Sequence, residues 1–136
     1  MVLPAQVRVL RTIIGVQVYR LLGLSLLQYS SSLSSAFLIP TVTGDLLTGV
    51  FAPVIAIAIS KKRGPRTWAA AIVWNVLGMT DLFYALTLAQ LTNAGSVVMS
   101  NDPVVVVGAI LGIILHIVSI GLLLQRKTID SLLSSS

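Results

Sequence analysis

The sequence contains no cysteine and few charged residues, and both absences narrow the classes of protein it can belong to. Without cysteine, the chain alone forms no disulfide, has no thiolate nucleophile and binds no iron–sulfur cluster. Charged residues make up only 10% of the 136 residues, whereas 56% are hydrophobic. A chain of this length cannot bury so much apolar surface in a water-soluble core, so it belongs in a lipid bilayer.

Motifs typical of common enzyme classes are missing as well. The chain has no phosphate-cradling glycine loop, no metalloprotease helix motif and no Gly-x-Ser-x-Gly elbow. Its many serines have no histidine and aspartate at a spacing that would suggest a catalytic triad. The sequence therefore predicts no catalytic residue. It argues against a conventional hydrolase and leaves an enzymatic role undecided.

The sequence does contain four long apolar segments, roughly residues 13–38, 40–60, 67–91 and 104–124. Each approaches the ~20 residues that a spanning helix needs. No segment alternates apolar and polar residues over ~10 residues, which argues against a transmembrane β-barrel. The sequence thus predicts an all-α fold, a four-helix transmembrane bundle that forms a single domain over residues 1–136. The basic and apolar start resembles a signal peptide, but we expect it to remain as the first span.

The basic residues give the chain a net charge of +5, and all except Arg20 flank the spans on one side. The opposite loops, around residues 30–43 and 92–103, contain no lysine or arginine. The positive-inside rule then places both termini in the cytoplasm, and we expect a bacterial inner membrane. Because these residues act as topology signals, we expect the lipid bilayer and no nucleic acid as a partner. They are Arg8, Arg11, Lys61, Lys62, Arg63, Arg66, Arg126 and Lys127.

Proline and glycine mark the turns between the spans. Gly64 and Pro65 predict the end of the second helix and the first turn of the third. Asp102 followed by Pro103 predicts a capping side chain and the start of the fourth helix. The serine-rich stretch 29–40 ends in a proline that biases the preceding backbone away from helix, so we expect the first span to end or break there.

Five polar residues lie within otherwise apolar segments, where such groups must be neutralised, paired or hydrated. A rise of ~1.5 Å per residue places three of them about 13–15 Å from the nearest flanking basic residue, and two aspartates about 22–24 Å from it. We expect the five to form one buried polar cluster on two adjacent levels. The first three are Arg20, Asn75 and His116, and the aspartates are Asp45 and Asp81.

Each of the two aspartates has a functional and a structural interpretation. Asp81 either binds a proton, a cation or a metal ion, or is a structural carboxyl group hydrogen-bonded across a helix interface. Trp74 lies on the same helical face as Asp81. Asp45 lies in the first turn of its span, where the helix dipole favours an acid without any further role. Thr48, on the face of Asp45, offers it a hydroxyl group.

Arg20 has two interpretations as well. Its side chain either reaches back to the membrane interface or forms ion pairs with Asp45 or Asp81. An ion pair would remove the cost of burying either charge alone. Gln17 lies on the same helical face as Arg20 and would extend a polar network.

His116 is the single histidine of the chain, and Ser119 follows it by about one helical turn. His116 either ligates haem or a transition metal, relays protons, or forms a structural hydrogen bond with Asn75 or Arg20. The sequence itself requires no cofactor. The candidate ligands for a metal ion are His116, Asp81 and Asp45.

Three stretches carry a resemblance to a known family: Gln17 to Arg20, Gly44 to Gly49 and, most specifically, Trp74 to Leu82. Their patterns resemble those of a family of small, uncharacterised bacterial multi-pass membrane proteins. Members of that family often have prolines in the last span, where this chain has Gly108 and Gly112. The family has no established activity, so the resemblance implies a multi-pass membrane protein with a polar cluster and no defined role.

These observations lead to three hypotheses for the function. The first is a binding or accessory subunit of a larger membrane assembly, with the polar cluster holding the bundle together. The second is a proton- or ion-coupled carrier of small solutes that works as a homo-oligomer, with Asp81 and Asp45 titrating and Arg20 as counter-charge. The third is a membrane haem or metal protein that uses His116. The expected partners are thus other protein subunits or further copies of the chain.

Overall fold

The computed structural model describes residues 5–61 and 64–134, and the side chains only as far as residue 125. Every element in this part of the chain is a helix. A 3-10 helix, η1, continues the first α-helix, and a short helix lies between the last two long ones. The elements are α1 (Ala5–Val16), η1 (Gln17–Tyr29), α2 (Ser35–Lys61), α3 (Pro65–Leu91), α4 (Ala94–Asn101) and α5 (Pro103–Ser134).

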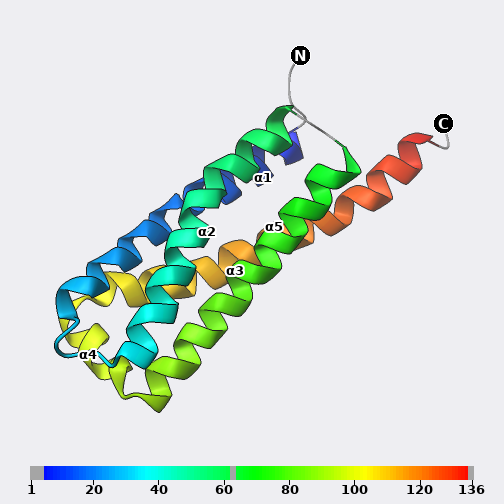
Figure 1. The fold of residues 1–136 in the computed structure, drawn as a ribbon. Coiled ribbons are helices and arrows are strands. Elements are labelled where there is room, and N and C mark those ends of the chain that lie inside the picture. The colour runs from blue at the N-terminus through cyan, green and yellow to red at the C-terminus, as the bar shows by residue number, and fades with distance from the viewer. Residues whose placement is uncertain (1–4, 62–63, 135–136) are drawn as a thin grey trace.

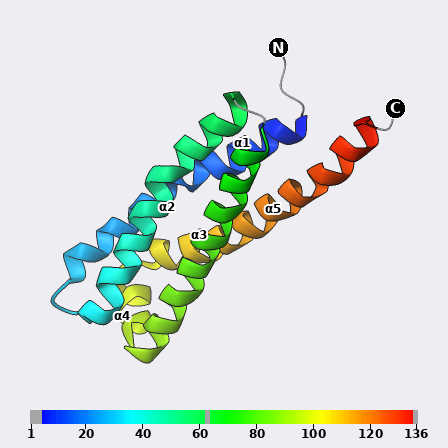
Figure 2. The same ribbon diagram turned by 45° about the vertical axis from the view of Figure 1, so that its right-hand side comes forward.

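Four helical segments are long and apolar enough to cross a membrane, as predicted: Ala5–Tyr29, Ser35–Lys61, Pro65–Leu91 and Pro103–Gln125. They form an elongated bundle in which the start of α1 and the end of α5 lie at the same end (Figures 1 and 2). The α2 helix packs against α1, η1 and α3, and α5 packs against α1, η1 and α3. Short α4 lies at the opposite end of the bundle (Figure 1).

The first helical segment begins and ends earlier than predicted, at Ala5–Tyr29 rather than 13–38, and the second helix begins earlier, at Ser35 rather than 40. The chain breaks at residues 30–34, inside the serine-rich stretch 29–40 where we expected the first span to end or break. The side chain of Ser34 accepts a hydrogen bond from the backbone N–H of Ala36 at 3.2 Å, which satisfies one free donor at the start of α2. Pro40 lies inside α2, near its start, where few backbone bonds are lost.

The loop expected over residues 92–103 contains α4, which the sequence analysis did not predict. Asn93 precedes it with φ of 56°, a left-handed conformation that asparagine adopts more readily than most residues. Pro65 and Pro103 open α3 and α5 as predicted. The carboxylate of Asp102 accepts a hydrogen bond from Ser25 Oγ at 2.5 Å, so it ties this turn to η1 and not to the start of α5.

The 3-10 geometry of η1 decides which of its side chains face the bundle. Its buried residues recur every third position, at Gln17, Arg20, Gly23 and Leu26. A 3-10 helix has three residues per turn, so these residues stay on one side. In an α-helix the same spacing would drift by roughly 60° per step, and Leu26 would face away from Gln17. The 3-10 geometry therefore keeps Gln17 and Arg20 directed into the protein over an unusually long run.

Two apolar clusters flank a layer of buried polar side chains. One cluster joins α1, α2, α3 and α5 near the basic end, and it comprises Val7, Leu10, Ile14, Ala52, Ala56, Ile59, Ala71, Trp74 and Leu123. The other lies toward α4 and comprises Leu26, Leu33, Phe37, Leu38, Ala94 and Val98. The buried polar residues are Gln17, Arg20, Thr41, Asp45, Thr48, Asn75, His116 and Ser119.

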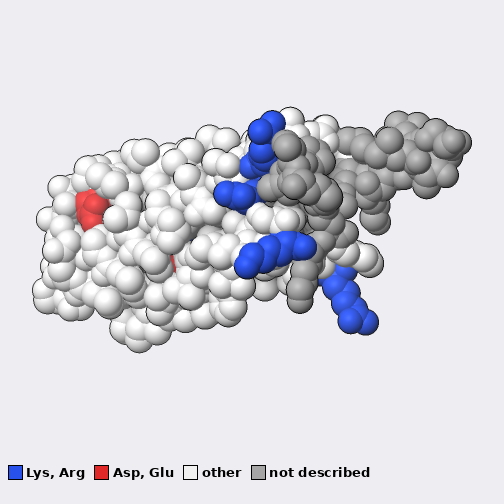
Figure 3. Space-filling model, turned by 90° about the horizontal axis from the view of Figure 1, so that it is seen from above, with Lys and Arg blue, Asp and Glu red and all other residues white. Residues whose placement is uncertain are grey.

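Exposed basic residues mark one end of the molecule. Figure 3 shows the visible lysine and arginine side chains gathered toward one end, with the visible aspartate surface elsewhere. The described members of this group are exposed: Arg8, Arg11, Lys61 and Arg66. Lys62 and Arg63 lie outside the described residues, and so do the side chains of Arg126 and Lys127.

Candidate functional site

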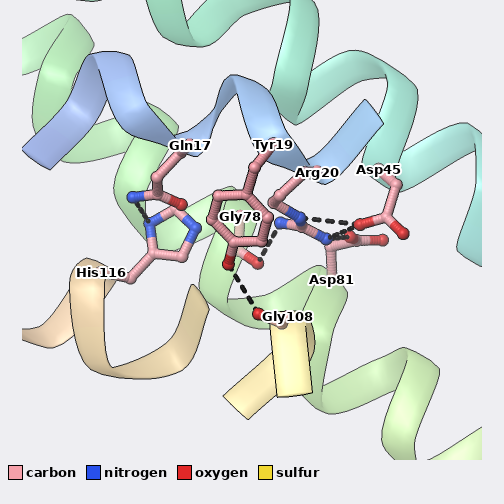
Figure 4. A network of polar contacts seen from close by, with 8 residues as sticks. All are labelled: Gln17, Tyr19, Arg20, Asp45, Gly78, Asp81, Gly108 and His116. Atoms are coloured by element: carbon pink, nitrogen blue, oxygen red, sulfur yellow. Dashed lines mark hydrogen bonds and ion pairs between the residues drawn. The ribbon is translucent and has the colours of Figure 1, made fainter. Parts of the chain in front are cut away.

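Arg20 joins two aspartates from different helices. Its Nε donates to Asp45 Oδ1 at 2.7 Å, and its Nη2 lies 2.6 Å from the same oxygen. Nη2 also pairs with Asp81 Oδ2, and Nη1 donates to the backbone carbonyl of Gly78 at 3.1 Å. Figure 4 shows the guanidinium group reaching both carboxylates. We call Arg20, Asp45 and Asp81 the Arg20 triad. Of the two interpretations of Arg20, the structure shows the ion-paired one.

Close helix contacts allow the two aspartates to reach the same guanidinium group. A Cβ atom at Gly44 would overlap the carboxylate of Asp81, and one at Gly23 would overlap that of Asp45. Both glycines thus let an acidic side chain lie directly against a neighbouring helix backbone. Arg20 itself is only 3% exposed, so it faces the interior of the bundle and does not reach the membrane interface.

The Arg20 triad carries unbalanced charge. With both carboxylates ionised, two negative charges face one guanidinium group and leave a net charge of −1. The side chain of Asp45 is 11% exposed and that of Asp81 is 19% exposed, so water screens neither strongly. A buried charge without a counter-charge is costly. The triad is therefore suited to bind a proton, a cation or a strong hydrogen-bond donor.

His116 forms a second polar group with Asn75 and Gln17. Asn75 Nδ2 donates to the carbonyl of Ala71 at 2.8 Å, so its Oδ1 is the atom that accepts from His116 Nδ1–H at 3.0 Å. Gln17 Nε2 lies 3.4 Å from the same ring nitrogen. This assignment makes Nε2 the unprotonated nitrogen of the ring. Nε2 is buried and has no hydrogen-bond partner among the described residues.

Of the residues predicted to support the cluster, Trp74 contacts the imidazole of His116 directly. The ring centroids of Trp74 and His116 lie 5.3 Å apart with the planes inclined at 54°. Ser119 is fully buried, and no described residue accepts or donates a hydrogen bond at its Oγ. A Cβ at Gly78 would lie 3.1 Å from the methyl group of Thr48 as well as close to the imidazole. Among the described residues, none of these three forms a hydrogen bond with His116.

The predicted cluster consists of two hydrogen-bonded groups that meet at Gly78. The carbonyl of Gly78 accepts from Arg20, while a Cβ at Gly78 would lie 2.5 Å from His116 Cε1 and Nε2. The backbone of α3 thus separates the triad from the imidazole. This explains why the Arg20 side chain pairs with the two aspartates, whereas Asn75 and His116 form a hydrogen bond with each other.

The surroundings of His116 do not fit a haem. Nε2 faces the backbone of Gly78, and Nδ1 is occupied by Asn75, so neither nitrogen has space for a haem plane. Across the described residues, no group of three or more histidine, cysteine, aspartate or glutamate side chains is placed to hold a metal ion. We therefore derive no chemistry through a metal or haem at His116.

A cavity of about 230 Å³ lies beside the triad, between η1, α2, α3, α4 and α5. Its wall includes two members of the triad, Arg20 and Asp45, and two polar residues close to them in the sequence, Tyr19 and Thr41. The remaining wall is mostly apolar, with side chains such as Leu22, Leu26, Phe37, Leu82, Leu86 and Val98. Apolar walls with a few convergent polar groups are typical of small-molecule sites.

Thr41 and Tyr19 were not predicted as site residues. Thr41 is 7% exposed, and its Oγ1 has no hydrogen-bond partner in the part of the chain that the structure describes. Tyr19 donates through its hydroxyl group to the carbonyl of Gly108 at 2.6 Å, as Figure 4 shows. Thr41 lies one helical turn before Asp45, and this spacing is the sequence signal that was available.

The chain matches one family model, described as a domain of unknown function (DUF8737), over residues 4–124. The chain belongs to this family. The match extends from before α1 into α5, so it includes both polar groups and the cavity. No curated protein and no solved structure matches the chain. Membership agrees with the expected resemblance to an uncharacterised family, and function has to be argued from the site.

Proposed function

We propose that this protein is an integral membrane protein that binds a small molecule beside the Arg20 triad, and that it does so as a binding subunit of a larger membrane assembly. The main observation in support of this proposal is that Arg20 and Asp45 form part of the wall of the cavity. A purely structural ion pair would be enclosed by packing on every side. Here the paired groups face an apolar space of about 230 Å³, which is the arrangement of a binding site.

The small amount of chain outside the spans supports the role of a subunit. Two of the connections between the long helices are the short break at residues 30–34 and the segment 92–102, which contains α4. Neither forms a separate soluble domain, so partners would contact this protein largely through its lipid-facing helices. The exposed apolar side chains of these helices include Leu77, Val107 and Ile114.

For the orientation, we propose a bacterial inner membrane with both termini in the cytoplasm. Four exposed basic residues lie in α1 near the start of the chain, at the end of α2 and at the start of α3. They are Arg8, Arg11, Lys61 and Arg66. The positive-inside rule assigns this end to the cytoplasm. The cavity, which α4 helps to enclose, then lies toward the outer side.

A proton- or ion-coupled carrier that works as a homo-oligomer is the second candidate. The net negative charge of the triad supports it, because uptake of a proton or cation would neutralise the site. The 3-10 geometry of η1 supports it as well, since long 3-10 stretches often mark hinges. Conversion of η1 to an α-helix would turn Arg20 relative to Gln17 and separate it from the aspartates.

Native mass spectrometry of the protein extracted from its own membrane in mild detergent tests the proposal. Additional protein subunits are expected, and a homo-oligomer alone would contradict the subunit role and favour the carrier. The Asp81→Asn variant adds a second criterion. The subunit role predicts that this variant loses partner subunits, whereas the carrier predicts intact assembly with loss of proton uptake into vesicles that contain a pH-sensitive dye. Asp102→Asn, which removes a carboxylate outside the triad, is the control.

A further inference from the structure

The polar end of the cavity offers hydrogen-bond acceptors. Asp45 Oδ1 accepts a hydrogen bond from Arg20 Nε and lies 2.6 Å from Nη2 in an ion pair. Asp45 Oδ2 receives no hydrogen bond from any described residue and lies against Gly23, another residue of the wall. Thr41 Oγ1 is buried and also unpartnered within the described residues. Most of the guanidinium donors are already engaged with Asp45, Asp81 and Gly78. A ligand at this end is therefore best served by several N–H donors.

Charge points to the same class of ligand. The triad has a net charge of −1 with both carboxylates ionised, and the surrounding wall is apolar, so little water screens it. A cation beside Asp45 would be attracted, whereas a carboxylate or phosphate would be repelled. A primary ammonium group combines a positive charge with three N–H donors. Its candidate acceptors are Asp45 Oδ2 and Thr41 Oγ1, which belong to two wall residues one helical turn apart.

The size of the cavity indicates the rest of the ligand. An apolar cavity of about 150 Å³ is known to hold benzene, which has six carbons, so about 230 Å³ has room for a tail of that size and a polar head group. The wall away from Thr41 and Asp45 consists mostly of leucine, valine, alanine and phenylalanine residues, with Met99 and the amide of Gln90 among them. An unbranched aliphatic tail of about six carbons matches both this volume and this wall.

We propose that the cavity binds primary alkylamines with short aliphatic tails, with the ammonium group between Thr41 and Asp45 and the tail toward Leu82 and Val98. This inference rests on the proposed function, because it names the class of molecule that the binding site accepts. A quaternary ammonium of similar size is excluded from the class, since it has no N–H to offer Thr41 Oγ1. The positive charge of the bound ammonium group offsets the net negative charge of the triad. Binding forms and breaks no covalent bond.

The test compares three unbranched six-carbon probes, n-hexylamine, n-hexanol and hexanoate, by native mass spectrometry of the purified full chain. Hexylamine is expected to bind in a 1:1 complex about tenfold or more tightly than hexanol, and hexanoate is expected not to bind. Asp45→Asn should abolish this preference for the amine. Thr41→Val keeps the shape of the side chain and removes the unpartnered hydroxyl group, so it should weaken the binding of hexylamine by about threefold to tenfold.

Matched alanine variants locate the binding. Ala109 forms part of the cavity wall, so Ala109→Phe fills the space and should abolish binding of hexylamine. Ala70 is exposed on α3 outside the cavity, and Ala70→Phe should leave binding unchanged. If hexanol or hexanoate binds as tightly as hexylamine and Ala109→Phe abolishes that binding, the cavity is a binding site but the amine class is wrong. If no probe binds, or if binding survives both Ala109→Phe and Thr41→Val, the proposed binding site is itself wrong.

Discussion

Replacing Arg20 with methionine should be among the most destabilising single changes in the described part of the chain. Methionine has a similar length but no charge, so the variant loses the ion pairs to Asp45 and Asp81 and the hydrogen bond to the carbonyl of Gly78. Two carboxylates then remain in an apolar surrounding without a counter-charge. Removing one partner of a buried pair typically costs about 3–5 kcal/mol.

A compensating variant separates charge from packing. In Arg20→Met/Asp45→Asn/Asp81→Asn the unpaired charges are gone, and replacing a whole buried ion network by neutral groups is often close to neutral for stability. We expect the triple variant to recover most of the loss and to lie within about 1–2 kcal/mol of the unmodified protein. Arg11→Met, which removes an exposed arginine from the same helical segment, should change stability by less than about 1 kcal/mol.

The free energy of unfolding can be measured by titrating the purified protein in mild detergent with sodium dodecyl sulfate and following helicity by circular dichroism. If Arg20→Met lowers the free energy of unfolding by less than about 1 kcal/mol, the loss is that of an exposed ion pair. Such a result would refute the burial of Arg20 between the two aspartates. A triple variant as unstable as the single variant would refute the argument from unpaired charge.

Two further predictions concern packing and orientation. A Cβ at Gly78 would lie 2.5 Å from the imidazole of His116, so Gly78→Ala should destabilise the protein by about 1–3 kcal/mol in the same titration. A Cβ at Gly121 would meet nothing within 4 Å, so Gly121→Ala is the control, and an equal loss there would show that close contact at Gly78 is not the cause. The chain has no cysteine, so single-cysteine variants report topology without background. An impermeant maleimide added to intact cells should label Ser100→Cys at the α4 end and leave Gly64→Cys unlabelled, and the reverse pattern would overturn the proposed orientation.

The number of helical segments long and apolar enough to cross a membrane, and the presence of buried polar groups, were predictable from the sequence. Both depend on local composition, since ~20 apolar residues suffice to mark a span and any charge within them stands out. Helix limits were less predictable. The break at residues 30–34 lies in the predicted stretch 29–40, but the helix after it already begins at Ser35 and includes Pro40, because a proline near the start of a helix loses few backbone hydrogen bonds. The α4 helix was missed because its eight residues carry no strong periodic signal.

The sequence by itself determined that this protein is apolar and helical, with four candidate spans and an acid and an arginine buried among them. These properties follow from residue type and spacing along one segment. Only the tertiary structure decided which groups meet. Arg20 joins Asp45 and Asp81 across three helical segments, because η1 adopts 3-10 geometry and two glycines let the helices approach. The cavity beside Thr41 is likewise a property of the assembled bundle, because its space is what five packed elements leave unfilled.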